Sequence, residues 1–200
     1  MATAVKLDAP RRTPTTAEEL LAWPDDQPGE IVDGVFVPKY RDGEVTGTGF
    51  AHGIVSIEIA LLLGAHVKAG RLGRVLAAET AFRLRRNPDV VRCPDVAFVA
   101  AARLTAGIPR GAFEGAPDLA VEVLSPTNTV PEMNRKLVDY LRYGVRSVWV
   151  IDPDARTVAV HPAGALPRWH QGDDVLDGGD VLPGFSVVTS AVFADLDPTA

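Results

Sequence analysis

The sequence predicts an α/β domain in which a mixed β-sheet is flanked by α-helices. Two long segments with helical periodicity, 52–67 and 132–143, alternate with short runs of β-forming residues. The run Val148–Ile151 is apolar on both faces, as in a central strand. Asp33-Gly34 between two apolar runs indicates a β-hairpin near the N-terminus. We therefore expect a single domain over residues 15–200, preceded by a flexible tail over residues 1–14.

The composition fits a globular protein that can build a core. The chain has 200 residues, of which 46% are hydrophobic and 23% charged. A single cysteine, Cys93, excludes an internal disulfide and a thiolate-rich zinc site. The apolar stretch Ile59–Leu63 is too short to span a bilayer, and no signal-peptide pattern is present. These features predict a cytoplasmic protein with no membrane partner.

The first predicted elements are a short helix and the hairpin. Thr15 or Thr16 is suited to cap a helix that ends before Pro24. The hairpin covers Glu30–Tyr40, with its turn at Asp33-Gly34.

A long helix and four β-forming runs follow. Apolar residues recur three or four apart over 52–67, and Gly70 and Gly73 close this helix. The runs 75–78 and 81–84 form one strand or two, and further strands are predicted at 96–99 and 119–124. The Gly- and Pro-rich run 107–115 predicts a loop, with a lid as an alternative reading.

The second half contributes the other helix and the remaining strands. Helix 132–143 has an apolar stripe and ends at Gly144. Strands are predicted at 148–151, 157–160, 168–170 and around 175, before a closing segment that begins at 182.

Three acidic residues stand where strands are normally apolar. Glu122 lies inside Leu119–Leu124 and shares a face with apolar neighbours, which favours a functional role because a buried carboxylate needs a partner. Asp95 follows Pro94 at a strand start, where turn chemistry is an equal alternative. Asp118 begins the strand of Glu122 and is more typical of a turn or cap residue.

Several other residues are weaker candidates. Lys136 borders the apolar stripe of its helix, so its ammonium reaches either the strand ends or the solvent, and Arg135 competes for the same role. Glu30 heads the hairpin and His52 starts a helix; a surface or structural role is the alternative for both. The Ser125 turn lies between a strand end and a helix start, where anions bind readily, although a simple helix start explains it equally well.

The charges leave the question of nucleic-acid binding open. The formal net charge of −6 argues against broad non-specific DNA binding. Arginines nevertheless cluster before Asp95, either as like charges on a solvated edge strand or as a rim that contacts phosphates. They are Arg83, Arg85, Arg86 and Arg92. No glycine-rich dinucleotide fingerprint or Walker-type loop is present, so no nucleotide cofactor is expected.

Six motifs in order resemble the Uma-type endonucleases of the PD-(D/E)XK, restriction-endonuclease-like superfamily. The resemblance runs from about residue 15 to 194, nearly the whole chain. The motifs are Glu-x-x-x-Gly (30–34), a helix led by His52, Arg-x-Pro-Asp-Val-x-Phe-Val (92–99), Asp-Leu-x-Val-Glu-Val-x-Ser-Pro (118–126), Lys-x-x-x-Tyr (136–140) and Gly-Val-x-x-x-Trp-x-x-Asp-Pro (144–153).

The resemblance implies a metal-dependent nuclease core. Asp95 and Glu122 match the two acidic residues of the superfamily motif, whereas Leu124 replaces its lysine, so Lys136 must supply the ammonium from the following helix. Mg²⁺, for which Mn²⁺ can substitute, is then expected on Asp95, Glu122 and the backbone carbonyl of Val123. Glu30, His52 and Asp118 are the expected auxiliary residues.

The implied function is cleavage of nucleic-acid phosphodiester bonds, with DNA as the expected substrate. A nuclease-fold protein that binds or regulates nucleic acid with little or no turnover is the alternative, since the strand lysine is missing. We also expect a homodimer, because each active site of a DNA-cutting enzyme cuts one strand. Phe185–Val188 either forms its interface or closes the core.

Overall fold

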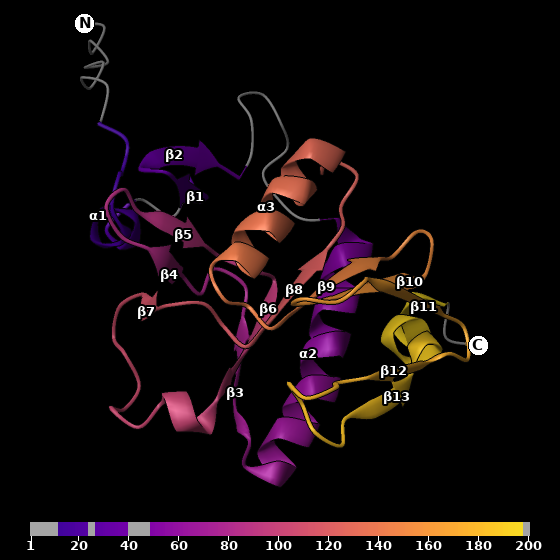
Figure 1. The fold of residues 1–200 in the computed structure, drawn as a ribbon. Helices are drawn as coiled ribbons and strands as arrows, with labels where there is room; N and C mark the ends of the chain where they lie inside the picture. Colours follow the sequence, from indigo (N-terminus) through magenta and orange to yellow (C-terminus); the bar gives the residue numbers. More distant parts are fainter. Residues whose placement is uncertain (1–11, 24–26, 40–48, 198–200) are drawn as a thin grey trace, which may run out of the picture.

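The computed structural model of the protein describes residues 12–23, 27–39 and 49–197 (Figure 1). Most of the tail predicted at 1–14, and Tyr40 at the end of the predicted hairpin, lie outside these residues. The described chain forms three β-sheets, two long α-helices and one short one.

The largest sheet is six-stranded and mixed, as predicted. Its order is β11 (Arg168–Gln171), β10 (Thr157–Pro162), β9 (Ser147–Asp152), β8 (Leu119–Val123), β6 (Val96–Ala100) and β3 (Gly73–Ala77). β8 and β9 pair in parallel, and every other neighbouring pair is antiparallel. The parallel pair requires a crossover, which α3 (Val130–Arg142) provides.

The two long helices cover opposite faces of this sheet (Figure 1). Alternate residues of β8 point to opposite sides: Val121 packs in the cluster that contains α2 (Phe50–Gly70), and Ala120 packs in the cluster that contains Tyr140 of α3. Glu122 therefore points toward the α3 side of the sheet, like Ala120.

A second, five-stranded sheet contains the predicted hairpin. Its order is β2 (Val35–Pro38), β1 (Gly29–Val32), β5 (Val90–Arg92), β4 (Phe82–Arg85) and β7 (Phe113–Glu114). The short helix α1 (Ala17–Leu21), capped by Thr16, packs against it. The sequence did not predict β5 or β7, because strands of two or three residues have no measurable periodicity. The predicted strands 75–78 and 81–84 are β3 and β4, which belong to different sheets.

The C-terminal segment closes the core. β12 (Val175–Asp177) pairs with β13 (Ser186–Val188), and the 3₁₀ helix η2 (Thr189–Leu196) follows β13. A first 3₁₀ helix, η1 (Ala101–Arg103), lies directly after β6. Phe185 is 3% exposed and its ring centroid lies 5.9 Å from that of Trp149. Of the two roles considered for Phe185–Val188, core closure therefore applies to Phe185.

Helix α2 corrects one sequence expectation. Its 21 residues are long and apolar enough, by length and composition alone, to cross a membrane, whereas the sequence reading considered only the stretch 59–63. In this fold one side of α2 packs on the sheet through buried apolar side chains. They are Val55, Ile59, Leu63 and Val67.

Candidate functional site

Asp95 and Glu122 are brought together by the register of two antiparallel strands. Val96 of β6 pairs with Val121 of β8, so the next positions along the ladder, Asp95 and Glu122, lie opposite each other. Both residues are buried, at 9% and 3% exposure. The backbone N–H of Val123 donates to Asp95 Oδ2 at 2.9 Å, which fixes the Asp95 carboxylate against β8.

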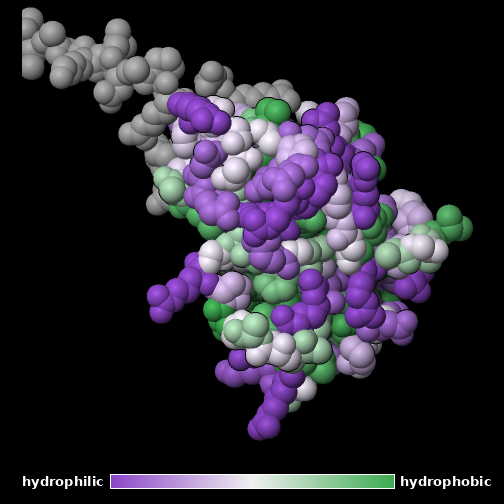
Figure 2. Space-filling model, turned by 60° about the vertical axis from the view of Figure 1, so that its left-hand side comes forward, coloured by the Kyte–Doolittle hydropathy of each residue, from purple (hydrophilic) through white to green (hydrophobic). Residues whose placement is uncertain are grey.

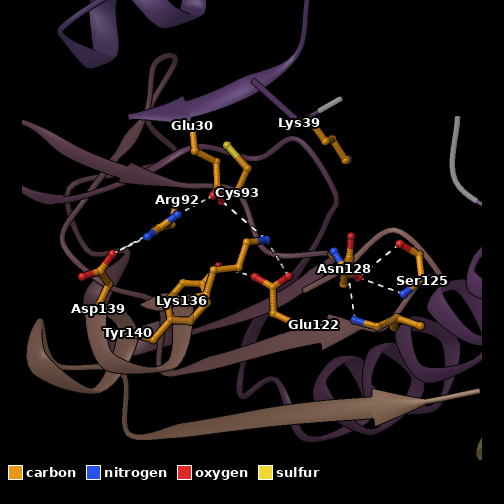
Figure 3. Close-up of polar contacts among 12 residues, drawn as sticks. Glu30, Lys39, Arg92, Cys93, Glu122, Ser125, Asn128, Lys136, Asp139 and Tyr140 are labelled. Atoms are coloured by element: carbon orange, nitrogen blue, oxygen red, sulfur yellow. Dashed lines mark hydrogen bonds and ion pairs between the residues drawn. The ribbon is translucent and has the colours of Figure 1, made fainter. Parts of the chain in front are cut away.

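Both carboxylate oxygens of Glu122 accept hydrogen bonds from α3 (Figure 3). Lys136 Nζ lies 2.8 Å from Oε2, and the Tyr140 hydroxyl donates to Oε1 at 2.6 Å. Lys136 and Tyr140 are four residues apart, so the same face of the helix presents both groups. Arg135, the competitor for the lysine's role, is exposed.

Glu30 joins the site from the N-terminal sheet. Its Oε1 accepts from the Cys93 N–H at 2.9 Å and lies 3.9 Å from Lys136 Nζ. Its Oε2 accepts from Arg92 Nη1 at 2.6 Å. The lysine ammonium therefore lies between two glutamates that come from different sheets.

Arg92 connects this sheet to α3. Its guanidinium donates to Glu30 and, from Nε at 3.1 Å, to Asp139 Oδ2, while its side chain is only 3% exposed. Asp139 is three residues after Lys136 on α3, so the pair fixes the helix next to the lysine. The sequence placed Arg92 in a surface arginine cluster, and its actual partners are distant in sequence.

His52 contacts the site from the opposite side of the sheet. Its Nε2 lies 3.2 Å from Asp95 Oδ2, and its Nδ1 lies 3.3 Å from the Ser56 hydroxyl. The first turns of α2 therefore orient Asp95, while α3 orients Glu122.

Burial and charge shift the two central carboxyl groups in opposite directions. Burial raises the pKa of Glu122 to about 7; the Lys136 ammonium opposes this rise, and the negative charges of Asp95 and Glu30 add to it. For Asp95 burial also acts to raise the pKa, but the bond to His52 and the Val123 N–H outweigh it, so the pKa lies below its ordinary value.

The neighbouring groups remain charged. Burial acts to lower the pKa of Lys136, but Glu122 and Glu30 raise it well above its ordinary value. Burial acts to raise the pKa of Glu30, and the charges of Lys136 and Arg92 bring it below its ordinary value. An ammonium is thus maintained beside a carboxyl group that titrates near neutrality.

Asp118 lies apart from this cluster. It is four residues from Glu122 along β8, about 13 Å in an extended strand. Its Oδ2 accepts from the Ala100 N–H at 2.8 Å and lies 3.2 Å from Arg103 Nη1. The structure therefore gives no geometric support to the auxiliary role predicted for Asp118, which holds the other end of the strand.

The arginines of β4 and the following turn are engaged in ion pairs. Arg83 contacts three acidic residues, Glu18, Asp89 and Glu114. Arg86 also contacts Glu114, and Arg85 contacts Asp33. Figure 2 shows that hydrophilic side chains gather over the upper part of the face to which the five-stranded sheet contributes. Arg83, whose side chain is only 2% exposed, is therefore held inside the fold, whereas Arg85 and Arg86 pair with exposed acidic residues.

A small cavity of about 50 Å³ opens onto the Asp95 and Glu30 side chains and onto Lys136. Besides Glu30, Asp95 and Lys136, its charged lining residues are Lys39, Glu79 and Glu132. The sequence analysis did not single out these three residues. For Glu132 a signal existed, because it precedes Lys136 by one helical turn and therefore lies on the same side of the helix. The Ser125 turn is closed on itself, because Asn128 Oδ1 accepts from both the N–H and the hydroxyl of Ser125.

The donor set fits a hard divalent cation better than a softer metal. Two opposed carboxylates and a strand carbonyl offer oxygen ligands, and Mg²⁺ binds through one or two carboxylates and retains several waters. A cation would also relieve the repulsion between Asp95 and Glu122. Within residues 12–23, 27–39 and 49–197, no group of three His, Cys, Asp or Glu side chains has the spacing of a metal site.

Comparisons with known proteins agree with this architecture. Residues 17–192 match the Uma2 family, described as "putative restriction endonuclease". A solved structure of a putative nuclease belonging to DUF820 from Anabaena variabilis superposes with a TM-score of 0.74 at 22% identity, covering 90% of this chain and 98% of that one. That structural likeness supports the fold. A search of curated proteins finds no match.

The first prediction concerns the Glu122 carboxyl in the metal-free protein. We expect it to titrate near pH 7, measured by NMR of its side-chain carbon, and Lys136→Met to raise that pKa because the ammonium is lost. Because the folded state binds the Glu122 proton more tightly than the unfolded state, the free energy of unfolding falls as the pH rises from 4.5 to about 7. Arg135→Met is the matched control; a Glu122 pKa near 4.5 would contradict this electrostatic account.

The second prediction concerns the buried arginine. Arg92→Met leaves Glu30 and Asp139 without their shared cation, and we expect a loss of roughly 3–5 kcal/mol in the free energy of unfolding, measured by denaturant titration. Arg156→Met, which breaks an exposed pair with Asp197, serves as control and should leave the transition nearly unchanged. Equal losses in the two variants would show that Arg92 has no special structural role.

Proposed function

Since the chain belongs to the Uma2 restriction-endonuclease family, we propose that it hydrolyses DNA phosphodiester bonds with a divalent cation at Asp95 and Glu122. The observation that carries this proposal is the opposed pair of buried carboxylates with the Lys136 ammonium 2.8 Å from one of them. Two acidic side chains and a lysine are costly to bury unless their charges compensate one another.

Asp95, Glu122 and the backbone carbonyl of Val123 are the proposed ligands of Mg²⁺, with Mn²⁺ as a substitute. A cation bound there would offset the negative charge of the phosphodiester and lower the pKa of a bound water. His52 and the Val123 N–H hold Asp95 in position for this role.

Lys136 replaces the lysine that the family motif places two residues after Glu122. Its ammonium stays protonated between Glu122 and Glu30, so it can hold the attacking water in place or stabilise the charge that develops on phosphate oxygens. Arg92 and Asp139 position the helix that carries it. The proposed assembly is a homodimer, because one site cuts one strand of a duplex.

A nuclease-fold protein that binds nucleic acid without turnover is the second candidate. It is favoured by the direct Lys136–Glu122 ion pair, which a cation must share or displace, and by the formal net charge of −6. Salt-dependent binding without cleavage is its signature.

The third prediction tests cleavage and metal binding together. Purified protein should nick supercoiled plasmid DNA only with Mg²⁺ or Mn²⁺, and Asp95→Asn and Glu122→Gln should each lower the rate at least about 100-fold. Isothermal titration should show Mg²⁺ binding that both substitutions abolish. Asp118→Asn is the control, because that carboxylate lies at the other end of β8.

Two results would contradict the proposal. Cleavage by Glu122→Gln at the parental rate would place the active site elsewhere. A mobility shift with no cleavage under any divalent cation would favour the second candidate.

A further inference from the structure

Helix α2 carries an apolar stripe on the side opposite its buried one. Phe50, Ile57 and Leu61 are 87%, 57% and 59% exposed, although their chemistry is that of core residues. A soluble helix normally presents polar residues on this side. Exposed apolar patches of this kind mark interaction surfaces.

The stripe has the spacing of a helix–helix seam. Its positions are separated alternately by four and three residues, the heptad pattern of a coiled coil. They are Phe50, Ile54, Ile57, Leu61, Gly64 and Lys68. The only charge in the stripe stands at its C-terminal end.

The stripe is complementary to itself when read in reverse. A two-fold axis at the level of residue 59 places Ile57 against Leu61, and Ile54 against Gly64. It also places Phe50 against Lys68, whose ammonium and stem suit an aromatic face. A Cβ added at Gly64 would meet no atom within 4 Å in this chain, although glycine inside a helix lowers its stability. The open space at Gly64 suits the side chain of Ile54 from another copy.

We propose that the outer side of α2 is the homodimer interface and that two copies pack with their α2 helices antiparallel. Ile54 faces Gly64, and Phe50 faces Lys68, in such a pair. This self-complementarity favours a second copy of this chain over an unrelated partner. A helix of 21 residues is about 31 Å long, so the contact belongs to the smaller class of specific interfaces.

The arrangement has a consequence for the candidate site. In an antiparallel pair, the C-terminal end of α2 from one copy lies beside the N-terminal end of the other, where His52 contacts Asp95. That C-terminal end borders a cavity lined by three cations, Lys68, Arg71 and Arg74. Each copy would thus bring a basic surface to the outer side of its partner's α2, near the helix end that carries His52, where it suits the phosphate backbone of a bound duplex. This consequence rests on the proposed nuclease function, whereas the interface itself does not.

Light scattering after size-exclusion chromatography tests the interface. The wild-type chain of 21.3 kDa should elute at twice that mass over about 1–200 μM. Leu61→Glu and Gly64→Leu should both be monomers with unchanged circular dichroism, the first through like charges at the seam and the second through a clash with Ile54 of the partner. Val138→Glu, at a position on α3 that is also 59% exposed, should remain a dimer.

Several outcomes would overturn the proposal. A monomeric wild type at the highest concentration would exclude the interface, and a dimer that survives both α2 substitutions would place the contact elsewhere. A monomer that co-sediments with phosphatidylcholine–phosphatidylglycerol vesicles would assign the apolar side of α2 to lipid. A further variant tests the basic surface. In the dimer, Arg71→Gln should weaken duplex binding and reduce the salt dependence of that binding. In the Leu61→Glu monomer, adding Arg71→Gln should change neither quantity, and an equal loss in monomer and dimer would contradict this role of the surface.

Discussion

The structure of the site depends on a carboxylate, Glu122, that is buried at the end of a central strand. A charge at 3% exposure is tolerated only where every oxygen has a partner. Tyr140 and Lys136 provide those partners from one helix, and Asp95 lies opposite on the neighbouring strand. The position of α3, the register of β6 and β8, and the protonation of the lysine are all linked to this group.

The lysine in turn makes the two sheets interdependent. Its ammonium lies between Glu122 of the six-stranded sheet and Glu30 of the hairpin sheet, and Arg92 closes the same network through Asp139. Because breaking a buried network leaves uncompensated charges, removal of one member affects the others. The N-terminal sheet is therefore part of the candidate site, although most of it is far from Glu122 in sequence.

A lysine on a helix can replace one on a strand because the requirement concerns the location of a charge. Position 124 is leucine, and its N–H is used to pair with Ile151 of β9. The ammonium arrives instead over the sheet face, one helical turn before Tyr140. In this chain a lysine from the following helix thus lies 2.8 Å from the glutamate, although the strand itself carries leucine at position 124.

The sequence by itself determined the mixed sheet, the two long helices and the hairpin, which follow from periodicity, a local signal. It also indicated Glu122 as an acid at an apolar position, whereas Asp95 and Lys136 were chosen over their alternatives through the resemblance to a family. The tertiary structure alone decided that Asp118 lies apart from the site, that Arg92 is buried beside Glu30, and that Arg83, Arg85 and Arg86 pair with acidic residues. Those outcomes depend on strand register and on contacts between residues 15 to 65 positions apart, which leave no trace in local spacing.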